Sequence, residues 1–180
     1  MRKVILYIAT SLDGYIAKPN NDLSFLSRVN QEGQDYGYSE FIGTIDSVIL
    51  GRKTYDWVMK NGKEFPHSNK DTYVITKTPR QKTDNIKFCS GNLKELVLKL
   101  KQAEGKNIFI DGGAEIVNEL LKEKLIDRFY ISIVPVLLGG GIRLFNGSFP
   151  EQNLKLKSSM QFETGLIQLY YELEDRQKNV

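Results

Sequence analysis

The sequence is poor in the residues on which disulfides, metal centres and many hydrolytic sites depend. It holds one cysteine, Cys89, and one histidine, His67. A single cysteine cannot form an internal disulfide or a thiolate metal site. A single histidine argues against a histidine-rich zinc site and against a Ser-His-Asp triad. His67 follows Phe65-Pro66 and precedes Ser68-Asn69, which predicts a loop histidine rather than a catalytic one. We therefore expect no metal.

Long hydrophobic runs are also missing. The apolar stretch near the N-terminus, residues 4–9, is far shorter than the roughly 20 residues that a membrane-spanning helix needs. It also lacks the cleavage pattern of a secretory signal. These absences, together with the scarcity of cysteine, predict a cytoplasmic protein without a membrane partner.

Charge of either sign is present in ordinary amounts but is not concentrated. The 25 lysines and arginines and the 22 aspartates and glutamates leave a formal net charge of +3. Cations dispersed in this way are typical of a solvated surface and do not indicate a nucleic-acid partner. The chain has 41% hydrophobic and 26% charged residues, which is a globular composition. Its length predicts a single domain over residues 1–180.

Short apolar runs alternate with helical patterns over the first two thirds of the chain. Continuous apolar runs predict buried strands at residues 4–9, 47–50, 72–75, 86–88 and 107–110. Leucine and valine recur at helical spacing over residues 93–100, with Ser90 or Asn92 as a cap, and again over residues 116–121. This alternation is typical of an α/β fold with a largely parallel sheet and helices on both faces.

The last third has a different pattern. Strand-like runs occupy residues 127–134, 154–162 and 166–173, with the turn signal Glu163-Thr164-Gly165 between the last two. Within residues 154–158, apolar and small residues alternate with Lys155 and Lys157, which predicts a half-exposed strand. The expected architecture is therefore a mixed, mostly parallel central sheet with an antiparallel C-terminal hairpin.

The segment Gly51-Arg52-Lys53-Thr54 follows a predicted buried strand and opens a predicted helix. The free N–H groups at a helix start, with their partial positive charge, favour phosphate. Gly51 allows close approach of the backbone, Arg52 offers a planar fork, and the next two residues add an ammonium and a hydroxyl. A plain strand–helix turn with two solvated cations explains the segment equally well.

Two further segments have the same position after a strand. Asp111-Gly112-Gly113-Ala114-Glu115 leaves the main chain bare where a dinucleotide could lie, although a tight turn looks the same. Thr76-Lys77-Thr78 offers hydroxyls and an ammonium to a terminal phosphate, such as the 2′-phosphate of NADP, and is otherwise an exposed polar loop. Ligands of open α/β sheets bind beyond the carboxyl ends of the strands. Several such turns in one sheet therefore favour a shared nucleotide site.

The first strand runs into Ser11-Leu12-Asp13-Gly14, which contains the turn signal Asp-Gly. Asp13 is either a turn residue that bonds to nearby backbone or a polar contact for a substrate. The residues alone leave these two interpretations open.

Together, these segments resemble those of the dihydrofolate reductase fold family. The branch that is most similar includes the C-terminal reductase domain of bacterial riboflavin-biosynthesis deaminase/reductases. The resemblance runs from Lys3 to about Leu173. It is carried by Ser11-Leu12-Asp13-Gly14, Gly51-Arg52-Lys53-Thr54-Tyr55, Asp111-Gly112-Gly113 and Pro135-Val136-Leu137-Leu138-Gly139-Gly140-Gly141.

The resemblance implies NADPH as the cofactor. The residues that it assigns to the phosphates, the adenine and the nicotinamide ribose are Gly51, Arg52, Lys53, Thr54, Thr76, Lys77, Gly112, Gly113, Ala114 and Glu115. Backbone at Ala9 and Ile16 would hold the nicotinamide carboxamide. The resemblance also implies a cis peptide bond between Gly112 and Gly113.

On the substrate side, the resemblance implies a contact from Ser11, Asp13 and Ser132. Dihydrofolate reductases bury a catalytic carboxylate on the helix after the first loop. Asp35 and Glu40 are the two candidates for it here, and Asp13 is the first choice for proton delivery. The arginine that holds the folate tail is replaced near Lys70, which cannot grip a carboxylate bidentately and so disfavours folate.

The predicted function is an NADPH-dependent reductase. Its hydride acceptor would be a small pyrimidine-like, pterin-like or ribosyl-derived compound, as in the 5-amino-6-(5-phosphoribosylamino)uracil reductase step of riboflavin biosynthesis. The alternatives are a dihydrofolate or pterin reductase and a nucleotide-binding module without turnover. Relatives commonly form homodimers, and the apolar residues 135–138 with Tyr170 and Tyr171 fit a symmetric interface.

Overall fold

The structure, a computed structural model, describes residues 1–62, 64–78, 80–81 and 85–174. Its centre is an eight-stranded sheet with the strand order β5-β4-β3-β6-β1-β7-β10-β9. The bounds of these strands are β1 (Val4–Ser11), β3 (Ile45–Gly51), β4 (Asp71–Ile75), β5 (Ile86–Cys89), β6 (Asn107–Gly112), β7 (Arg128–Val134), β9 (Leu154–Gln161) and β10 (Ile167–Leu173). A small second sheet pairs β2 (Tyr15–Ala17) with β8 (Ile142–Arg143).

Every pairing from β5 across to β7 is parallel, whereas β10 is antiparallel to both β7 and β9. The carboxyl ends of β1, β3, β4, β5, β6 and β7 therefore lie along one edge of the sheet. The predicted mixed, mostly parallel sheet with an antiparallel C-terminal hairpin is confirmed. This edge is where the loops that follow the strands come together.

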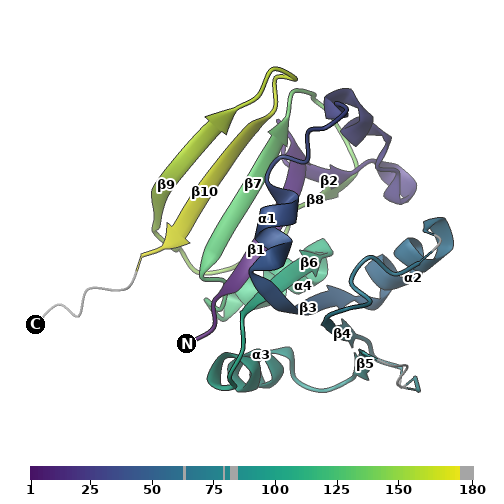
Figure 1. Ribbon diagram of the computed structural model, residues 1–180, viewed down its shortest axis with the longest axis vertical. Helices are drawn as coiled ribbons and strands as arrows, with labels where there is room; N and C mark the ends of the chain where they lie inside the picture. Colours follow the sequence, from purple (N-terminus) through teal and green to yellow (C-terminus); the bar gives the residue numbers. More distant parts are fainter. Residues whose placement is uncertain (63, 79, 82–84, 175–180) are drawn as a thin grey trace, which may run out of the picture.

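Helices cover both faces of the sheet because the central strands are apolar on both faces. In β1, Ile5 packs into the core beneath α1 (Tyr38–Gly43) and α2 (Arg52–Asn61). Its neighbour Leu6 packs into the opposite core with α3 (Leu93–Gln102) and α4 (Ala114–Lys122). Figure 1 shows α1 and α4 on opposite sides of the sheet. The predicted helix at residues 93–100 begins as expected, since Asn92 Oδ1 accepts a hydrogen bond from the Glu95 N–H.

The connection from β2 to α1 forms two short 3₁₀ helices, η1 (Pro19–Asn21) and η2 (Ser24–Val29). Phe25 and Val29 of η2 form a small third core with Val134 and Leu166. This cluster holds the connection against the carboxyl end of β7. Of the helices in the described ranges, none is long and apolar enough to cross a membrane.

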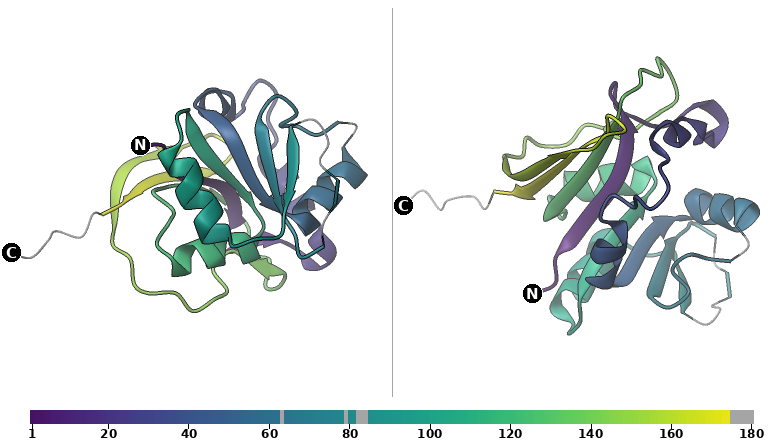
Figure 2. Two further views of the ribbon diagram at one scale, coloured as in Figure 1. Left: turned by 90° about the horizontal axis from the view of Figure 1, so that it is seen from below. Right: turned by 45° about the horizontal axis from the view of Figure 1, so that its top comes forward.

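The predicted half-exposed pattern of β9 is wrong. All eight of its residues are exposed, including Leu154, Leu156 and Met160. The physical reason is its position. The strand is the outer edge of the sheet, it pairs with β10 alone, and no helix of the described chain lies over it in Figure 2.

Candidate cofactor and substrate site

Two glycine turns meet at the carboxyl ends of the adjacent strands β3 and β6. Gly51 is the N-cap of α2 and Gly113 is the N-cap of α4, and a glycine at this position has no side chain with which to cap its helix. A Cβ atom on Gly113 would lie 3.2 Å from Thr54 Oγ1, and one on Gly51 would lie 3.9 Å from the Gly113 nitrogen. The two helix starts therefore converge, and their first N–H groups are available to an anion. The sequence predicted these two turns separately, and the sheet brings them together.

The peptide bond between Gly112 and Gly113 is cis, as predicted. Gly112 has a φ of 105°, a backbone conformation that favours glycine. Ala114 and Glu115 follow in the first turn of α4.

Basic side chains surround the start of α2, and the structure pairs them with carboxylates. Arg52 Nη1 donates to Asp56 Oδ2 at 2.5 Å, and Arg80 Nη1 donates to the other oxygen of Asp56 at 2.9 Å. Lys53 Nζ lies 2.9 Å from Glu115 Oε1 at the start of α4. The side chains of these pairs are at least 36% exposed, so each pair is weak and a phosphate can compete for the cation. Arg80 is a cation near the site that the sequence reasoning missed.

The strand end at β4 is only partly available to a ligand. The Thr76 side chain is buried, and its Oγ1 accepts from the Thr78 N–H at 3.1 Å and donates to the Thr78 carbonyl. Lys77 is exposed. A cavity of about 280 Å³ lies beside this strand end and is lined by Ile75, Cys89, Gly91, Asn92, Glu95, Leu96 and Lys99. Among the residues that the structure describes, Lys77 forms no side-chain hydrogen bond or ion pair, whereas the Thr76 hydroxyl is used within the turn.

The Asp13 carboxylate clamps two loops together. It accepts hydrogen bonds from Ser11 Oγ at 2.6 Å, from the Leu138 N–H at 3.0 Å and from the Gly139 N–H at 2.7 Å. The hydrogen bond from Ser11, followed by those from the two backbone groups, lowers the pKa of Asp13 to about 2. An ionised carboxylate with these partners is a poor proton donor at neutral pH. The structure therefore favours the turn interpretation and argues against proton delivery by Asp13.

A second cavity of about 280 Å³ lies at the carboxyl ends of β1 and β7, against the segment that leads into α1. Its lining residues are Tyr7, Ala9, Leu26, Val29, Asn30, Gln34, Asp35, Tyr36, Tyr38, Ser132 and Leu166. Three predicted site residues are therefore brought together here, namely Ala9, Asp35 and Ser132. Ala9 and Ser132 face each other in the register of β1 and β7. Ser11 and Ile16 are not among the lining residues.

The structure distinguishes between the two carboxylates near α1. Asp35 lines the cavity and accepts hydrogen bonds from the Gly37 N–H at 2.9 Å and the Ser39 N–H at 3.0 Å. The hydrogen bonds from Ser39, and then that from Gly37, lower the pKa of Asp35. Glu40 is exposed on α1 and does not line the cavity. Asp35 is therefore the carboxylate at this cavity, where it is an anionic hydrogen-bond acceptor rather than an acid, and a role for Glu40 in the site stays a prediction.

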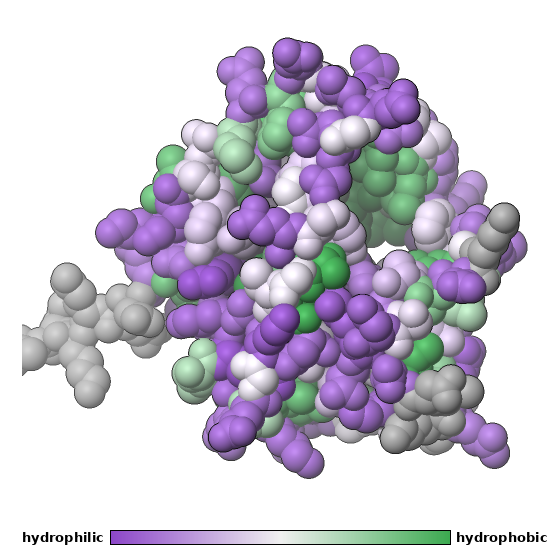
Figure 3. All heavy atoms as spheres, in the orientation of Figure 1, coloured by the Kyte–Doolittle hydropathy of each residue, from purple (hydrophilic) through white to green (hydrophobic). Residues whose placement is uncertain are grey.

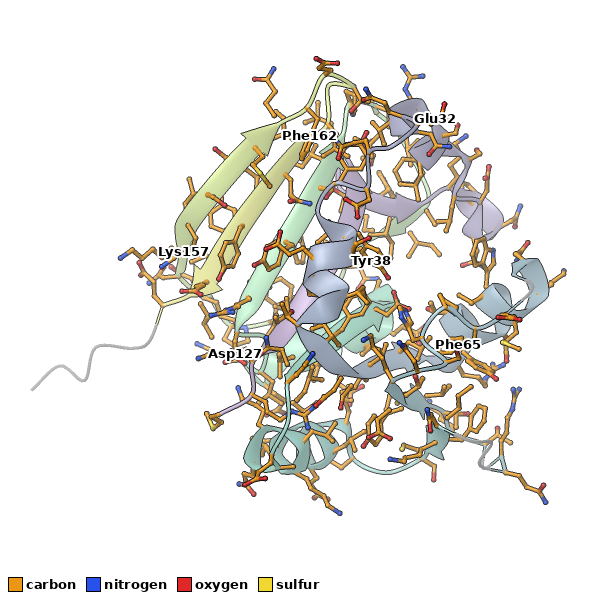
Figure 4. The ribbon with its side chains drawn as sticks, in the orientation of Figure 1. Glu32, Tyr38, Phe65, Asp127, Lys157 and Phe162 are labelled. Atoms are coloured by element: carbon orange, nitrogen blue, oxygen red, sulfur yellow. The ribbon has the colours of Figure 1, made fainter. Side chains whose placement is uncertain are left out.

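The surface between α2 and the segment that carries η1 and η2 is hollowed, and Figure 3 shows that its floor is hydrophobic. Tyr38 lies on the side of α1 that faces this hollow, and Phe65 lies on the far side of it (Figure 4). Burial, followed by the charges of Asp111 and Tyr7, raises the pKa of Tyr38. A hollow with an apolar floor is typical of a small-molecule site.

His67 lies in a turn, as predicted, but it is only 3% exposed. Its Nε2 is 3.5 Å from Asp111 Oδ2, and its ring packs edge-on against Phe65 and Phe109. The sequence reasoning missed this pair, because nothing local links position 67 to the end of β6. The pair brings a histidine and a carboxylate to the base of the turn that carries Gly112 and Gly113.

Residues 48–168 match the family model described as the RibD C-terminal domain. Over 171 residues the chain is 44% identical to the uncharacterized protein YwjB of Bacillus subtilis (strain 168), a match that covers 94% of this chain and 97% of YwjB. The crystal structure of a "Putative riboflavin biosynthesis protein" from Shewanella sp. PV-4 is similar, with a TM-score of 0.88 and 31% identity, over 96% of this chain and 99% of that one.

The fold is also that of a dihydrofolate reductase. The enzyme from Enterococcus faecalis, in a structure complexed with NADP(H), matches with a TM-score of 0.64 and 18% identity, over 96% of this chain and 97% of that one. At this identity the likeness shows the fold alone. The fold family predicted from the motifs is thereby confirmed.

Proposed function

Since the chain belongs to the RibD C-terminal domain family, we propose that it is an NADPH-dependent oxidoreductase. Its substrate would be a small pyrimidine-like, pterin-like or ribosyl-derived compound, similar to the substrate of 5-amino-6-(5-phosphoribosylamino)uracil reductase. The observation that carries the proposal is the convergence of the α2 and α4 N-termini at Gly51 and Gly113. Two uncapped helix starts at neighbouring strand ends suit the diphosphate of a dinucleotide.

The residues around this cradle fit NADPH. The absence of Cβ atoms at Gly51 and Gly113 lets the two turns approach each other closely, since a Cβ on Gly51 would lie 3.4 Å from Ile116 Cγ1 and one on Gly113 would lie 3.2 Å from Thr54 Oγ1. The N–H groups of both helix starts are thereby brought near one diphosphate. Arg52 and Lys77 would bind the 2′-phosphate. Arg80 lies close to Arg52, since both arginines donate to Asp56. A guanidinium binds phosphate bidentately, which supports a preference for NADPH over NADH.

When bound, NADPH supplies the hydride. The protein's own contribution is position and the exclusion of water. Ala9 and Ser132 line the wall at the ends of β1 and β7, and Asp35 supplies an anionic acceptor for an N–H group of the substrate. Leu26, Val29 and Leu166 make part of the same cavity apolar, which favours a dry site.

A nucleotide-binding module without turnover is the second candidate. It is favoured by the state of the carboxylates, because Asp13 and Asp35 both have lowered pKa values and accept backbone hydrogen bonds. Neither side chain is therefore a proton donor at neutral pH. A reductase would need its proton from another group or from solvent.

One experiment tests the proposal and separates it from the second candidate. Calorimetric titration with NADPH and NADH measures cofactor binding, and steady NADPH oxidation with a panel of pterins and pyrimidines measures turnover. We expect NADPH to bind more tightly than NADH and at least one pyrimidine or pterin to be reduced. Binding without oxidation of NADPH by any of the panel would favour the binding module. Absence of heat with both nucleotides would exclude both functions.

We further propose that the protein forms a homodimer. The edge strand β9 exposes Leu154 and Leu156, and Leu137 in the loop after β7 is 69% exposed. Tyr170, expected at the interface as an exposed aromatic, is half-buried and stacks on Tyr130 with ring centroids 4.4 Å apart. The exposed leucines therefore support the proposal better than the tyrosines do. Light scattering of the wild type and of Leu156→Glu tests it, with a dimer expected for the first and a monomer for the second.

A further inference from the structure

Gln168 is a buried amide directly behind the cavity at the ends of β1 and β7. Its side chain comes from β10 and is only 4% exposed. Its Nε2 donates to Ser132 Oγ at 3.1 Å, to the Tyr7 hydroxyl at 3.0 Å and to the Tyr36 carbonyl at 3.2 Å. Ser132, Tyr7 and Tyr36 all line the cavity. Gln168 does not line it, so this residue acts on the cavity through its neighbours.

The partners of Gln168 fix which way its amide points. The Tyr36 carbonyl can only accept a hydrogen bond, so the amide must present its nitrogen there. The Tyr7 hydroxyl donates its own hydrogen to the same carbonyl at 2.8 Å. One hydrogen of Nε2 is therefore shared between the Tyr36 carbonyl and the Tyr7 oxygen, which lie next to each other, and the second hydrogen is directed to Ser132 Oγ. A flipped amide would place two acceptors against each other and is excluded.

This arrangement determines what Ser132 offers to a ligand. Its oxygen accepts from Gln168, and within the described ranges it donates to no other group of the protein. A serine hydroxyl has one hydrogen to donate. The Tyr7 hydroxyl, by contrast, donates to the Tyr36 carbonyl, and the Tyr36 hydroxyl donates to the Val29 carbonyl. The hydrogen of Ser132 thus remains for the ligand.

We propose that Gln168 is a positioning residue that makes Ser132 a hydrogen-bond donor toward the cavity, so that the site selects a heterocycle with an acceptor on that side. Asp35 on the same cavity presents a carboxylate, which only accepts. A ring lactam, in which a carbonyl oxygen lies beside an N–H group, offers one partner to each. This inference rests on the proposed function, because it specifies the substrate class of that site.

The test uses two pteridines that differ in hydrogen-bond polarity. Lumazine carries two ring carbonyl oxygens, whereas 2,4-diaminopteridine carries amino groups at the same positions. Calorimetry gives the ratio of their dissociation constants for the wild type, Gln168→Glu, Ser132→Ala and the double variant. A glutamate places an acceptor against Ser132 and draws the serine hydrogen away from the cavity. We expect the preference for lumazine to fall about tenfold in Gln168→Glu, the effect of one hydrogen bond.

The double variant isolates the role of Ser132. In the Ser132→Ala background, Gln168→Glu should leave the probe ratio unchanged, because the group through which Gln168 acts is gone. Gln168→Leu serves if the glutamate variant does not fold, and should weaken the preference in the same direction. Gln102→Glu, on the exposed surface of α3, is the matched control and should keep the wild-type ratio.

The outcomes separate this inference from the proposed function. Titration with NADPH in the same samples reports on the reductase, while the probe ratio, measured with and without NADPH, reports on Gln168. The inference is overturned if the wild type shows no preference for lumazine or binds neither probe. It is equally overturned if both Gln168 variants keep the wild-type ratio. Loss of NADPH binding alone would count against the reductase only.

Discussion

The two halves of the site are built in different ways. On the cofactor side, each turn is a local unit in which a strand ends at a glycine and a helix begins, as at Gly51 and Gly113. On the substrate side, the cavity depends on residues from distant parts of the chain, such as Tyr7, Ser132 and Gln168. The cofactor side can therefore be recognised in short segments of the sequence, whereas the substrate side forms only when β1, β7 and β10 pair.

The two halves also differ in how their polar groups are held. The cations of the cofactor side form exposed pairs, such as Lys53 with Glu115, whose side chains are 74% and 80% exposed. The hydroxyls and the amide of the substrate side form a buried network around Gln168. Exposed pairs exchange partners at little cost, whereas a buried network fixes its polarity. We infer that the cofactor side is suited to binding a charged ligand, and that the substrate side is suited to selecting a neutral ligand by its hydrogen-bonding groups.

The largest expected effect comes from filling the cofactor cradle. In Gly113→Val, the side chain starts 3.2 Å from Thr54 Oγ1 and extends into the space between the two helix starts. Overpacking of this size should weaken NADPH binding by about tenfold to a hundredfold in calorimetry. Gly43→Ala at the end of α1, where an added Cβ meets nothing within 4 Å, is the control and should bind like the wild type. Normal NADPH affinity in folded Gly113→Val would mean that the cofactor lies elsewhere.

Arg52→Ala should have the next largest effect, and a selective one. Arg52 stands at the start of α2, and the side chain of its present partner, Asp56, is 36% exposed. Loss of a charge-assisted contact to the 2′-phosphate should weaken the binding of NADPH by about tenfold and leave the binding of NADH nearly unchanged. Arg28→Ala, an exposed arginine of η2, is the matched control. Equal losses for the two nucleotides would show that Arg52 contacts a part that they share.

The same contrast explains how much the sequence could predict. The strands of the central sheet, both helical faces and the C-terminal hairpin follow from local periodicity and are confirmed, and of the two candidate caps the structure uses Asn92. The short strands β2 and β8 were not predicted. The exposure of β9 was not predictable in this way. The alternating pattern of β9 predicts one buried face. Whether a helix covers that face depends on where the strand lies in the sheet.

For the site, the sequence identified the glycine turns and the basic residues beside them. It could not choose between Asp35 and Glu40, because that choice depends on how α1 is rotated against the sheet. It also missed Gln168, since an amide inside a strand-like run looks like an ordinary polar position. Its importance arises from three partners on β1, β7 and the segment before α1.

A third prediction concerns the Asp13 carboxylate, which joins the loops that follow β1 and β7. The pKa of Asp13 is lowered to about 2 from 3.8, and such a group contributes stability that is present above the unfolded pKa and lost as the pH falls through the folded one. Asp13→Asn should therefore unfold at lower urea concentration than the wild type at pH 7. The difference in unfolding urea concentration between the two proteins should become smaller as the pH falls from about 4 to about 2. NADPH affinity should stay nearly intact. A stability difference that does not depend on pH would show that the charge of the carboxylate is not its cause.

The smallest expected effect tests whether exposed pairs on the cofactor side really exchange partners. Glu115→Gln frees Lys53 and removes a negative charge from the start of α4. Because the pair is exposed, the free energy of unfolding should hardly change, and NADPH should bind up to about threefold more tightly at low salt. Screening should abolish this gain at high salt. Glu104→Gln, an exposed glutamate in the loop after α3, is the control. Weaker NADPH binding by Glu115→Gln would instead mean that Glu115 contacts the cofactor, for example through a ribose hydroxyl. The Lys53–Glu115 pair would then be part of the cofactor site.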